Sequence, residues 1–192
     1  MKTLPVLLLM VALCLGVQAC ATAPLTQSQK DEQRASIRDM ANQTLDQVYQ
    51  QYPDAQSKVR NAAGYAVFSD SGLKFMYGGG AHGKGVAVNN ATKQATYMEM
   101  VELQPGFGFG AEKFRIVFLF ETQPAFDQFV TSGWELGANA MAAAKSGGQG
   151  EGGQMGVTVS PGVTMYQLSE EGGIVGVSIT AAKYYKDASL NY

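Results

Sequence analysis

The stretch YGGGAHGKGVAV, residues 77–88, places five glycines within the eight positions from 78 to 85. It fits two phosphate-binding patterns at once. Gly78, Gly83 and Lys84 match the G-x-x-x-x-G-K part of a P-loop, and Gly78, Gly80 and Gly83 match G-x-G-x-x-G. Whether these glycines bind a phosphate group or shape a sheet decides the fold and separates two classes of function.

The residues that follow the glycines do not suit a nucleotide site. A P-loop requires a hydroxyl residue after its lysine and a helix whose N-terminus faces the phosphate. Here Lys84 is followed by Gly85, and residues 86–88 read as a strand that ends in a turn at Asn89 and Asn90. The dinucleotide pattern fails for the same reason, because it also needs a helix. We therefore predict no nucleotide ligand and no cofactor.

A structural explanation of the glycines remains. Glycine inside a strand marks a bulge, a bend, or a place where two backbones approach closely. Ordering glycine costs more conformational entropy than ordering other residues, so the fold must require contact without side chains. The stretch GFGFG at 106–110 repeats the arrangement, with Phe107 and Phe109 on one face and bare backbone on the other. Both stretches predict a sharply curved sheet.

The hydrophobic pattern around the glycines predicts an α+β fold. N-terminal helices are followed by a curved, mostly antiparallel, glycine-rich β-sheet with one inserted helix. The predicted helices cover 28–51, 53–63 and 123–132, and the predicted strands cover 65–68, 73–77, 86–88, 95–103, 106–121, 163–168 and 174–185. A turn is expected at 69–72. Residues 134–145 are ambiguous, and 146–153 read as a glycine-rich loop and the expected site of disorder.

Two of these elements indicate which surfaces are buried. The apolar stripe of helix 28–51 consists of Ile37, Met40, Leu45, Val48 and Tyr52. The opposite face carries both charge signs, which favours docking on the chain's own sheet over lying on a bilayer. In strand 106–121 the apolar side chains alternate between two faces: Phe114, Ile116, Phe118 and Phe120 on one, Val117 and Leu119 on the other. This strand is expected to be buried on both sides.

The first twenty residues, MKTLPVLLLMVALCLGVQAC, have the pattern of a secretory signal. The apolar run is shorter than the roughly 20 residues of a membrane span. Residues 17–20 resemble a bacterial lipobox, which makes Cys20 the expected lipid-attachment site; an ordinary cleavage site is the alternative. Ala21 follows, and by resemblance to enterobacterial sorting rules this favours an outer-membrane anchor with the domain facing the periplasm.

These features predict the organisation of the chain. It divides into a signal peptide at 1–19, a lipidated tether at 20–29, N-terminal helices at 30–63 and a β-rich domain at 64–192. Cys14 lies in the removed segment, so no disulfide and no cysteine metal site are expected in the mature chain. Losing Lys2 takes the net charge from −2 to −3, which argues against nucleic acid as a partner.

Five stretches together resemble the SYLF domain family of lipid-binding proteins, which includes yeast actin-patch proteins. They are GYAVF at 64–68, GGGAHGKGVAV at 78–88, PGFGFGAEKFRIVFLF at 105–120, TQPAFDQFVTSGWELGANA at 122–140 and GVTMYQLSEEGGIVGVSITAAKYYKDASLN at 162–191. The resemblance covers about 60–190. It implies binding to phospholipid membranes, including phosphoinositides in eukaryotes, and actin binding in yeast members. The lipobox and the mildly acidic charge depart from that pattern, and a bacterial envelope offers no actin.

Six basic residues are the candidates for binding a lipid headgroup: Lys74, Lys84, Lys113, Arg115, Lys183 and Lys186. Each cation near an anionic membrane surface contributes about 1 kcal/mol. The alternative interpretation is that they are scattered, solvated charges.

Other reactive or amphipathic side chains favour structural roles. His82 is the single histidine and has no partner at metal-ligand spacing, so a turn residue is expected and no metal. Trp134, Tyr184 and Tyr185 suit either a membrane interface or, with better support, core packing. The chain has no G-x-S-x-G motif and no free thiol after maturation, so we do not expect an enzyme.

The sequence thus predicts a lipid-anchored envelope protein with a SYLF-like phospholipid-binding domain. The alternative is a structural or stress-related envelope lipoprotein whose domain binds a protein partner.

Overall fold

A computed structural model of the chain describes residues 24–75, 78–105, 110–137, 156–169 and 181–192. Its helices are α2 (Gln27–Gln51), α3 (Pro53–Asn61) and α4 (Gln123–Ser132). Its strands are β1 (Gly64–Phe75), β2 (Gly78–Asn89), β3 (Ala95–Pro105), β4 (Gly110–Phe120), β5 (Trp134–Leu136), β6 (Val157–Ser160), β7 (Val163–Ser169) and β8 (Ala181–Lys186). The predicted α+β class is confirmed. None of the described helices is both long and apolar enough to cross a membrane.

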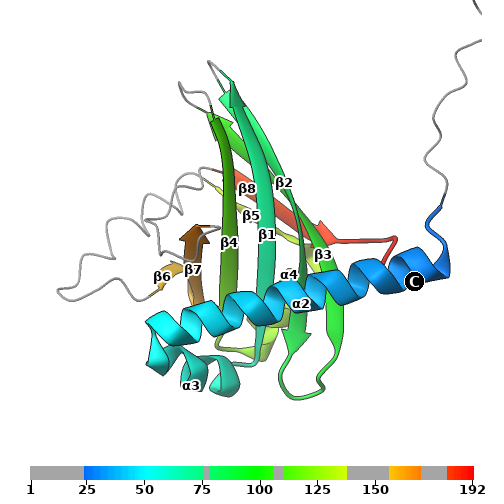
Figure 1. The fold of residues 1–192 in the computed structure, drawn as a ribbon. Coiled ribbons are helices and arrows are strands. Elements are labelled where there is room, and N and C mark those ends of the chain that lie inside the picture. Colours follow the sequence, from blue (N-terminus) through cyan, green and yellow to red (C-terminus); the bar gives the residue numbers. More distant parts are fainter. Residues whose placement is uncertain (1–23, 76–77, 106–109, 138–155, 170–180) are drawn as a thin grey trace, which may run out of the picture.

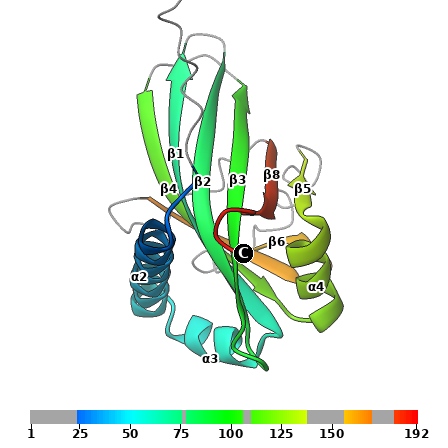
Figure 2. The same cartoon turned by 90° about the vertical axis from the view of Figure 1, so that its right-hand side faces the viewer.

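The strands form one sheet in the order β5-β8-β3-β2-β1-β4-β7-β6, and every neighbouring pair is antiparallel. The four long strands β1–β4 lie in the middle, and the sheet curls strongly around its inner face (Figure 1). Helices α2 and α4 lie on opposite sides of the sheet (Figure 2). We call the face that carries α2 the outer face and the opposite face the inner face.

The glycine stretch forms strand β2 itself, and two of its glycines allow close contact between strands. A Cβ atom added at Gly83 would lie 2.7 Å from the carbonyl oxygen of Ser69. At Gly85 it would collide with the carbonyl oxygen of Val67 and the ring of Phe68. Because Gly83 and Gly85 flank Lys84 in the middle of a strand, no helix opens there. The structural interpretation of these glycines is confirmed, and the P-loop pattern has no counterpart in the fold.

Helix α2 docks on the outer face of the sheet, as its balanced polar face predicted. Its buried side chains Ile37, Leu45 and Val48 pack in one cluster with Val67 of β1 and Val117 of β4. At its N-terminus the side chain of Thr26 accepts a hydrogen bond from the backbone of Gln29, whose side chain in turn accepts one from the backbone of Thr26. This capping box starts the helix at Gln27, inside the stretch expected to be tether.

The inner face holds an aromatic core that α4 helps to cover. The ring centroid of Tyr184, on β8, lies 4.9 Å from that of Phe68 and 5.1 Å from that of Phe118. Phe126 and Phe129 of α4 complete the cluster. Strand β4 is buried on both faces, as predicted, because Ile116, Phe118 and Phe120 face this core while Val117 and Leu119 face α2.

The structure corrects several predicted boundaries. Residues 65–77 were expected to form two short strands around a turn at 69–72, but β1 is continuous from Gly64 to Phe75. Ser69, Asp70 and Ser71 remain in the strand because they have partners on both β2 and β4, and Asp70 Oδ1 also accepts a hydrogen bond from the backbone N–H of Phe114. Strand β6 was not predicted, and part of the ambiguous segment forms β5.

Some predictions fall outside the described residues. They concern the signal segment with Cys20, the glycines at 106–109, the loop at 146–153 and the first part of the strand predicted at 174–185.

Candidate functional site

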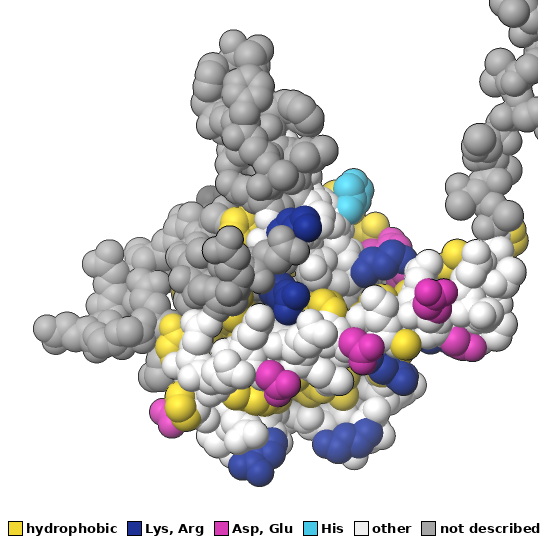
Figure 3. Space-filling view, viewed as in Figure 1, with side chains coloured by type: hydrophobic (Ala, Val, Ile, Leu, Met, Phe, Trp, Pro, Cys, Tyr) yellow, Lys and Arg dark blue, Asp and Glu magenta, His cyan; other side chains and the backbone are white. Residues whose placement is uncertain are grey.

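Two neighbouring cavities lie on the outer face of the sheet and share the side chain of Tyr185. The polar cavity, about 660 Å³ in volume, lies between the first half of α2 and strands β1, β2 and β3. The apolar cavity, about 480 Å³, lies over β3, β8 and β5. Both volumes fall in the range of about 300–1,000 Å³ that is usual for small-molecule sites. Figure 3 looks onto the outer face and shows basic and acidic side chains interspersed along α2.

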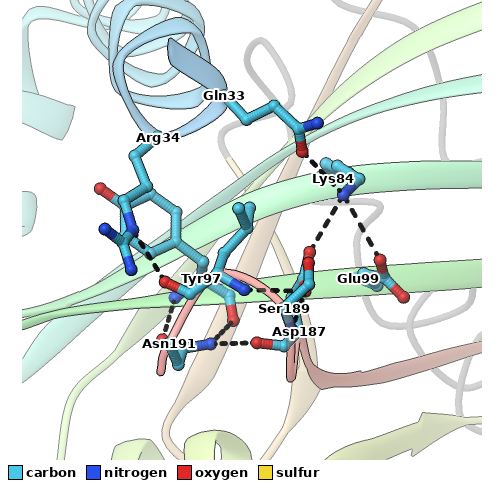
Figure 4. Close-up of polar contacts among 9 residues, drawn as sticks. Gln33, Arg34, Lys84, Tyr97, Glu99, Asp187, Ser189 and Asn191 are labelled. Carbon is cyan, nitrogen blue, oxygen red and sulfur yellow. Dashed lines mark hydrogen bonds and ion pairs between the residues drawn. The ribbon is translucent and has the colours of Figure 1, made fainter. Parts of the chain in front are cut away.

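Lys84 lies in the wall of the polar cavity and is surrounded by acceptors. Its Nζ atom lies 3.0 Å from Asp187 Oδ2, 3.5 Å from Glu99 Oε1 and 3.3 Å from Gln33 Oε1 (Figure 4). One cation therefore faces two carboxylates, so this group carries a net charge of about −1 at neutral pH. Such a group does not offer excess positive charge to an anionic ligand.

Asp187 is the buried member of this group, with a side chain that is 2% exposed. Burial by itself raises the pKa of its carboxyl. Hydrogen bonds from Ser189 and Lys84, together with the charge of Lys84, outweigh that effect, and the pKa lies below its ordinary value. Oδ1 also accepts hydrogen bonds from the backbone N–H groups of Ser189 and Leu190. Asp187 thus remains ionised while it organises the turn at the end of β8.

The segment after β8 connects α2 to β3. The side chain of Asn191 accepts a hydrogen bond from the backbone N–H of Tyr97 at 3.0 Å and donates one to the backbone carbonyl of Tyr97 at 2.7 Å. Arg34 of α2 donates from Nε to the carbonyl of Leu190 at 2.8 Å, and the Leu190 side chain is buried (Figure 4). Sequence reasoning missed Asp187 and Asn191 as organising residues. The only available signal was their place in the stretch KYYKDASLN.

The apolar cavity is lined mainly by aliphatic side chains and has a charged pair at its border. Leu103 of β3, which is 64% exposed, contributes to its wall together with Val101 and Leu136. Lys183 Nζ and Glu135 Oε1, also in the lining, lie 2.9 Å apart. A single exposed leucine is common on protein surfaces, but an apolar cavity of this size is the kind of site that takes apolar ligands.

The six predicted basic residues do not all lie on one surface. Strand alternation places Lys84, Lys113, Arg115 and Lys183 on the outer face. Lys186 lies three positions after Lys183 on β8, so the two side chains project from opposite faces and Lys186 is on the inner face. Its Nζ atom lies 5.3 Å from the ring centroid of Tyr192. The side chain of Lys74 lies outside the described part of β1.

Several of these cations already form hydrogen bonds or ion pairs within the protein. Arg115 donates to Gln47 Oε1 of α2 at 3.3 Å, Lys183 pairs with Glu135, and Lys84 pairs with Asp187. Headgroup binding by the six residues stays a prediction.

The remaining predicted side chains have clear positions. His82 was expected in a turn, but it is an exposed residue in the middle of β2 and lines the polar cavity, since the glycines around it continue the strand. No group of His, Cys, Asp or Glu in the described part of the chain could hold a metal ion. Core packing is confirmed for Tyr184 and Trp134. Tyr185 lies between the two cavities; burial and a hydrogen bond to Glu99 raise the pKa of its hydroxyl.

Comparison with known proteins gives two matches. Residues 101–192 match the protein family Ysc84, described as Las17-binding protein actin regulator. The chain is also 33% identical over 159 residues to beta cell expansion factor A of Aeromonas veronii, an alignment that covers 83% of this chain. The chain spans 59% of the length of that relative.

Proposed function

The C-terminal half of the chain, residues 101–192, belongs to the Ysc84 (SYLF) family, and on that premise we propose that the protein is a lipid-anchored envelope protein whose β-rich domain binds phospholipid. The proposal places the anchor on Cys20 in the outer membrane, with the domain in the periplasm. It involves no catalytic step. The observation that carries it is the apolar cavity over β3, β8 and β5, which has the exposed Leu103 in its wall.

Physical chemistry favours an acyl chain as the apolar part of the ligand. Each methylene group that leaves water for an apolar environment contributes about 0.8 kcal/mol. The cavity offers aliphatic contacts from Val101, Leu103 and Ala181, and the Lys183 ammonium lies in its lining, where it can pair with a phosphate. An acyl chain joined to a charged headgroup matches both parts.

The proposed anchor is consistent with this position. Gln27, where α2 begins, lies seven positions after Cys20, and an extended chain covers at most about 25 Å over that distance. Acylation at Cys20 would therefore keep the N-terminus of α2 within about 25 Å of the bilayer surface. Cys20→Ser is expected to remove the acyl mass from the intact protein in mass spectrometry and to release the protein from the membrane fraction.

Liposome flotation of the protein made without residues 1–19 and with Cys20→Ser tests lipid binding by the domain itself. We expect flotation with phospholipid vesicles, and we expect Leu103→Asp to reduce it strongly. Tyr192→Asp is the matched control, because Tyr192 is also a large exposed hydrophobic residue and the substitution adds the same charge, but Tyr192 does not line the cavity. Equal flotation of the two variants would contradict the assignment to this cavity.

A protein partner is the second candidate, because the family description names binding to a protein. It predicts that the same unacylated protein floats with no vesicle and is recovered from envelope extracts with a stoichiometric companion.

A further inference from the structure

A pair of opposite charges borders the apolar cavity and is fixed there by strand register. Glu135 of β5 lies directly opposite Lys183 of β8 in the antiparallel ladder, and both side chains project from the outer face. Their charged atoms lie 2.9 Å apart, and both residues line the cavity. The cavity therefore offers one cation and one anion side by side next to aliphatic side chains.

The two charges are accessible to a ligand. The side chain of Lys183 is 62% exposed and that of Glu135 is 74% exposed. An ion pair in water contributes little to stability, since its attraction is screened and its long side chains lose freedom when they pair. A ligand with both charge signs can therefore replace the internal pair by two new pairs without leaving either side chain unmatched.

The surrounding charges disfavour a purely anionic ligand. Across the shared Tyr185 lies the group in which Lys84 faces the carboxylates of Glu99 and Asp187. With Glu135 and Lys183 included, the linings of the two cavities carry two cations and two carboxylates, and the buried Asp187 beside Lys84 adds a third carboxylate. Since like charges brought together cost free energy, a headgroup with only negative charge is repelled by Glu135 as it approaches Lys183.

We propose that the apolar cavity selects a zwitterionic phospholipid with a primary ammonium in its headgroup, the ethanolamine class. Its phosphate pairs with Lys183, its ammonium donates to the carboxylate of Glu135, and an acyl chain contacts Leu103. This inference rests on the proposed phospholipid binding and adds the headgroup class. A quaternary ammonium carries the same charge but has no N–H group to donate to Glu135.

Trp134 provides a readout, because it is the only tryptophan of the chain and its ring packs on the inner face of β5, across the strand from the neighbouring Glu135. The whole mature protein, freed of bound lipid in mild detergent, is titrated with short-chain phospholipids that carry brominated acyl chains and either an ethanolamine, choline or glycerol headgroup. Quenching of Trp134 fluorescence then reports lipid bound near β5, and weaker quenching in Leu103→Ser assigns that lipid to this cavity. We expect the dissociation constant of the ethanolamine lipid to be lower than those of the other two by a factor of about three or more.

Two substitutions at Glu135 separate headgroup recognition from general charge. Glu135→Gln is expected to remove the preference for ethanolamine over choline, and Glu135→Lys to shift the preference to the glycerol headgroup. Asp39→Asn and Asp39→Lys on α2 change the net charge by the same amounts outside the cavity lining, and they should keep the ethanolamine preference. Leu103→Ser should weaken all three lipids alike. Unchanged melting temperatures exclude misfolding.

The inference is overturned if the wild-type protein prefers the glycerol headgroup, or if Glu135→Gln keeps the ethanolamine preference. Vesicle flotation without quenching of Trp134 by any brominated lipid also overturns it while leaving phospholipid binding intact. Absence of both signals overturns the proposed function itself.

Discussion

Lys84 of β2 donates a hydrogen bond to Asp187, 103 positions later in the chain, across 3.0 Å. The contact joins the middle of the glycine-rich strand to the turn that follows β8, and the same Asp187 caps the segment that holds the N-terminal half of α2. A lysine that the sequence places within a P-loop pattern therefore has a structural role.

Removing Lys84 is expected to destabilise the protein. Lys84→Met leaves the buried carboxylate of Asp187 without its cation, and we expect a loss of about 1–2 kcal/mol in the free energy of unfolding, less than for a fully buried pair because Lys84 is partly exposed. Urea denaturation measures the loss. Adding Asp187→Asn to Lys84→Met should recover part of it, since the buried charge is then gone. If the loss in the double variant equals the sum of the losses in the two single variants, the two residues are not coupled and this prediction is contradicted.

The same pair predicts a pH dependence. The folded-state pKa of Asp187 lies below its unfolded value of 3.8. Its ionised form is therefore favoured by folding, and the contribution to stability is fully present above that pH and is lost as the pH falls below it toward the folded pKa. Unfolding curves between neutral and acidic pH should show a drop in stability below about pH 4, and the drop should be smaller in Asp187→Asn. If the wild-type protein and Asp187→Asn lose stability identically at acidic pH, Asp187 is not the group responsible.

Glycines of β2 should differ in their tolerance of a side chain. Gly85→Ala places a methyl group against the Val67 carbonyl and the Phe68 ring, and overpacking of this kind costs about 1–3 kcal/mol. Gly80→Ala is the control in the same strand, because its Cβ would lie 3.5 Å from the nearest atom, the Glu102 carbonyl oxygen. Thermal unfolding should show a clear loss for the first and a change near zero for the second. Similar losses at both positions would contradict the contact explanation, because backbone entropy alone favours alanine over glycine within a strand.

Two arginines of α2 allow the hydrogen bond to the C-terminal segment to be measured separately from the contact with the Tyr97 ring. The guanidinium carbons of Arg34 and Arg38 lie 5.9 and 5.6 Å from the ring centroid of Tyr97, but of the two only Arg34 is seen to donate to the Leu190 carbonyl. Arg34→Ala should therefore cost about 1 kcal/mol more than Arg38→Ala. Hydrogen exchange at residues 187–192 should also speed up in Arg34→Ala and stay unchanged in Arg38→Ala. The reverse order would show that the ring contact dominates.

Much of the fold could be predicted because the relevant signals are local. The 3.6-residue period of Ile37, Leu45 and Val48 predicts α2 and its buried face, and the two-residue period of β4 predicts burial on both sides. The turn predicted at 69–72 was wrong because Ser69 and Asp70 are polar residues of the kind found in turns, while their strand partners lie 13 positions or more away. The local signal carried no information about those partners.

The candidate site was predicted less well. Composition identified six basic residues but not their faces or their acidic neighbours. Glu135 and Lys183 are separated by 48 positions, and only the pairing of β5 with β8 makes them neighbours. The apolar cavity likewise combines side chains of three strands that are not consecutive in the chain.

By itself, the sequence determined the types of most elements, the α+β class, the docking of α2 and the structural role of the clustered glycines, because side-chain periodicity and backbone sterics act over a few residues. Only the tertiary structure decided which charges meet, where an apolar cavity remains and which strand each polar side chain joins. Those outcomes depend on strand order and register, which are set by contacts between distant segments.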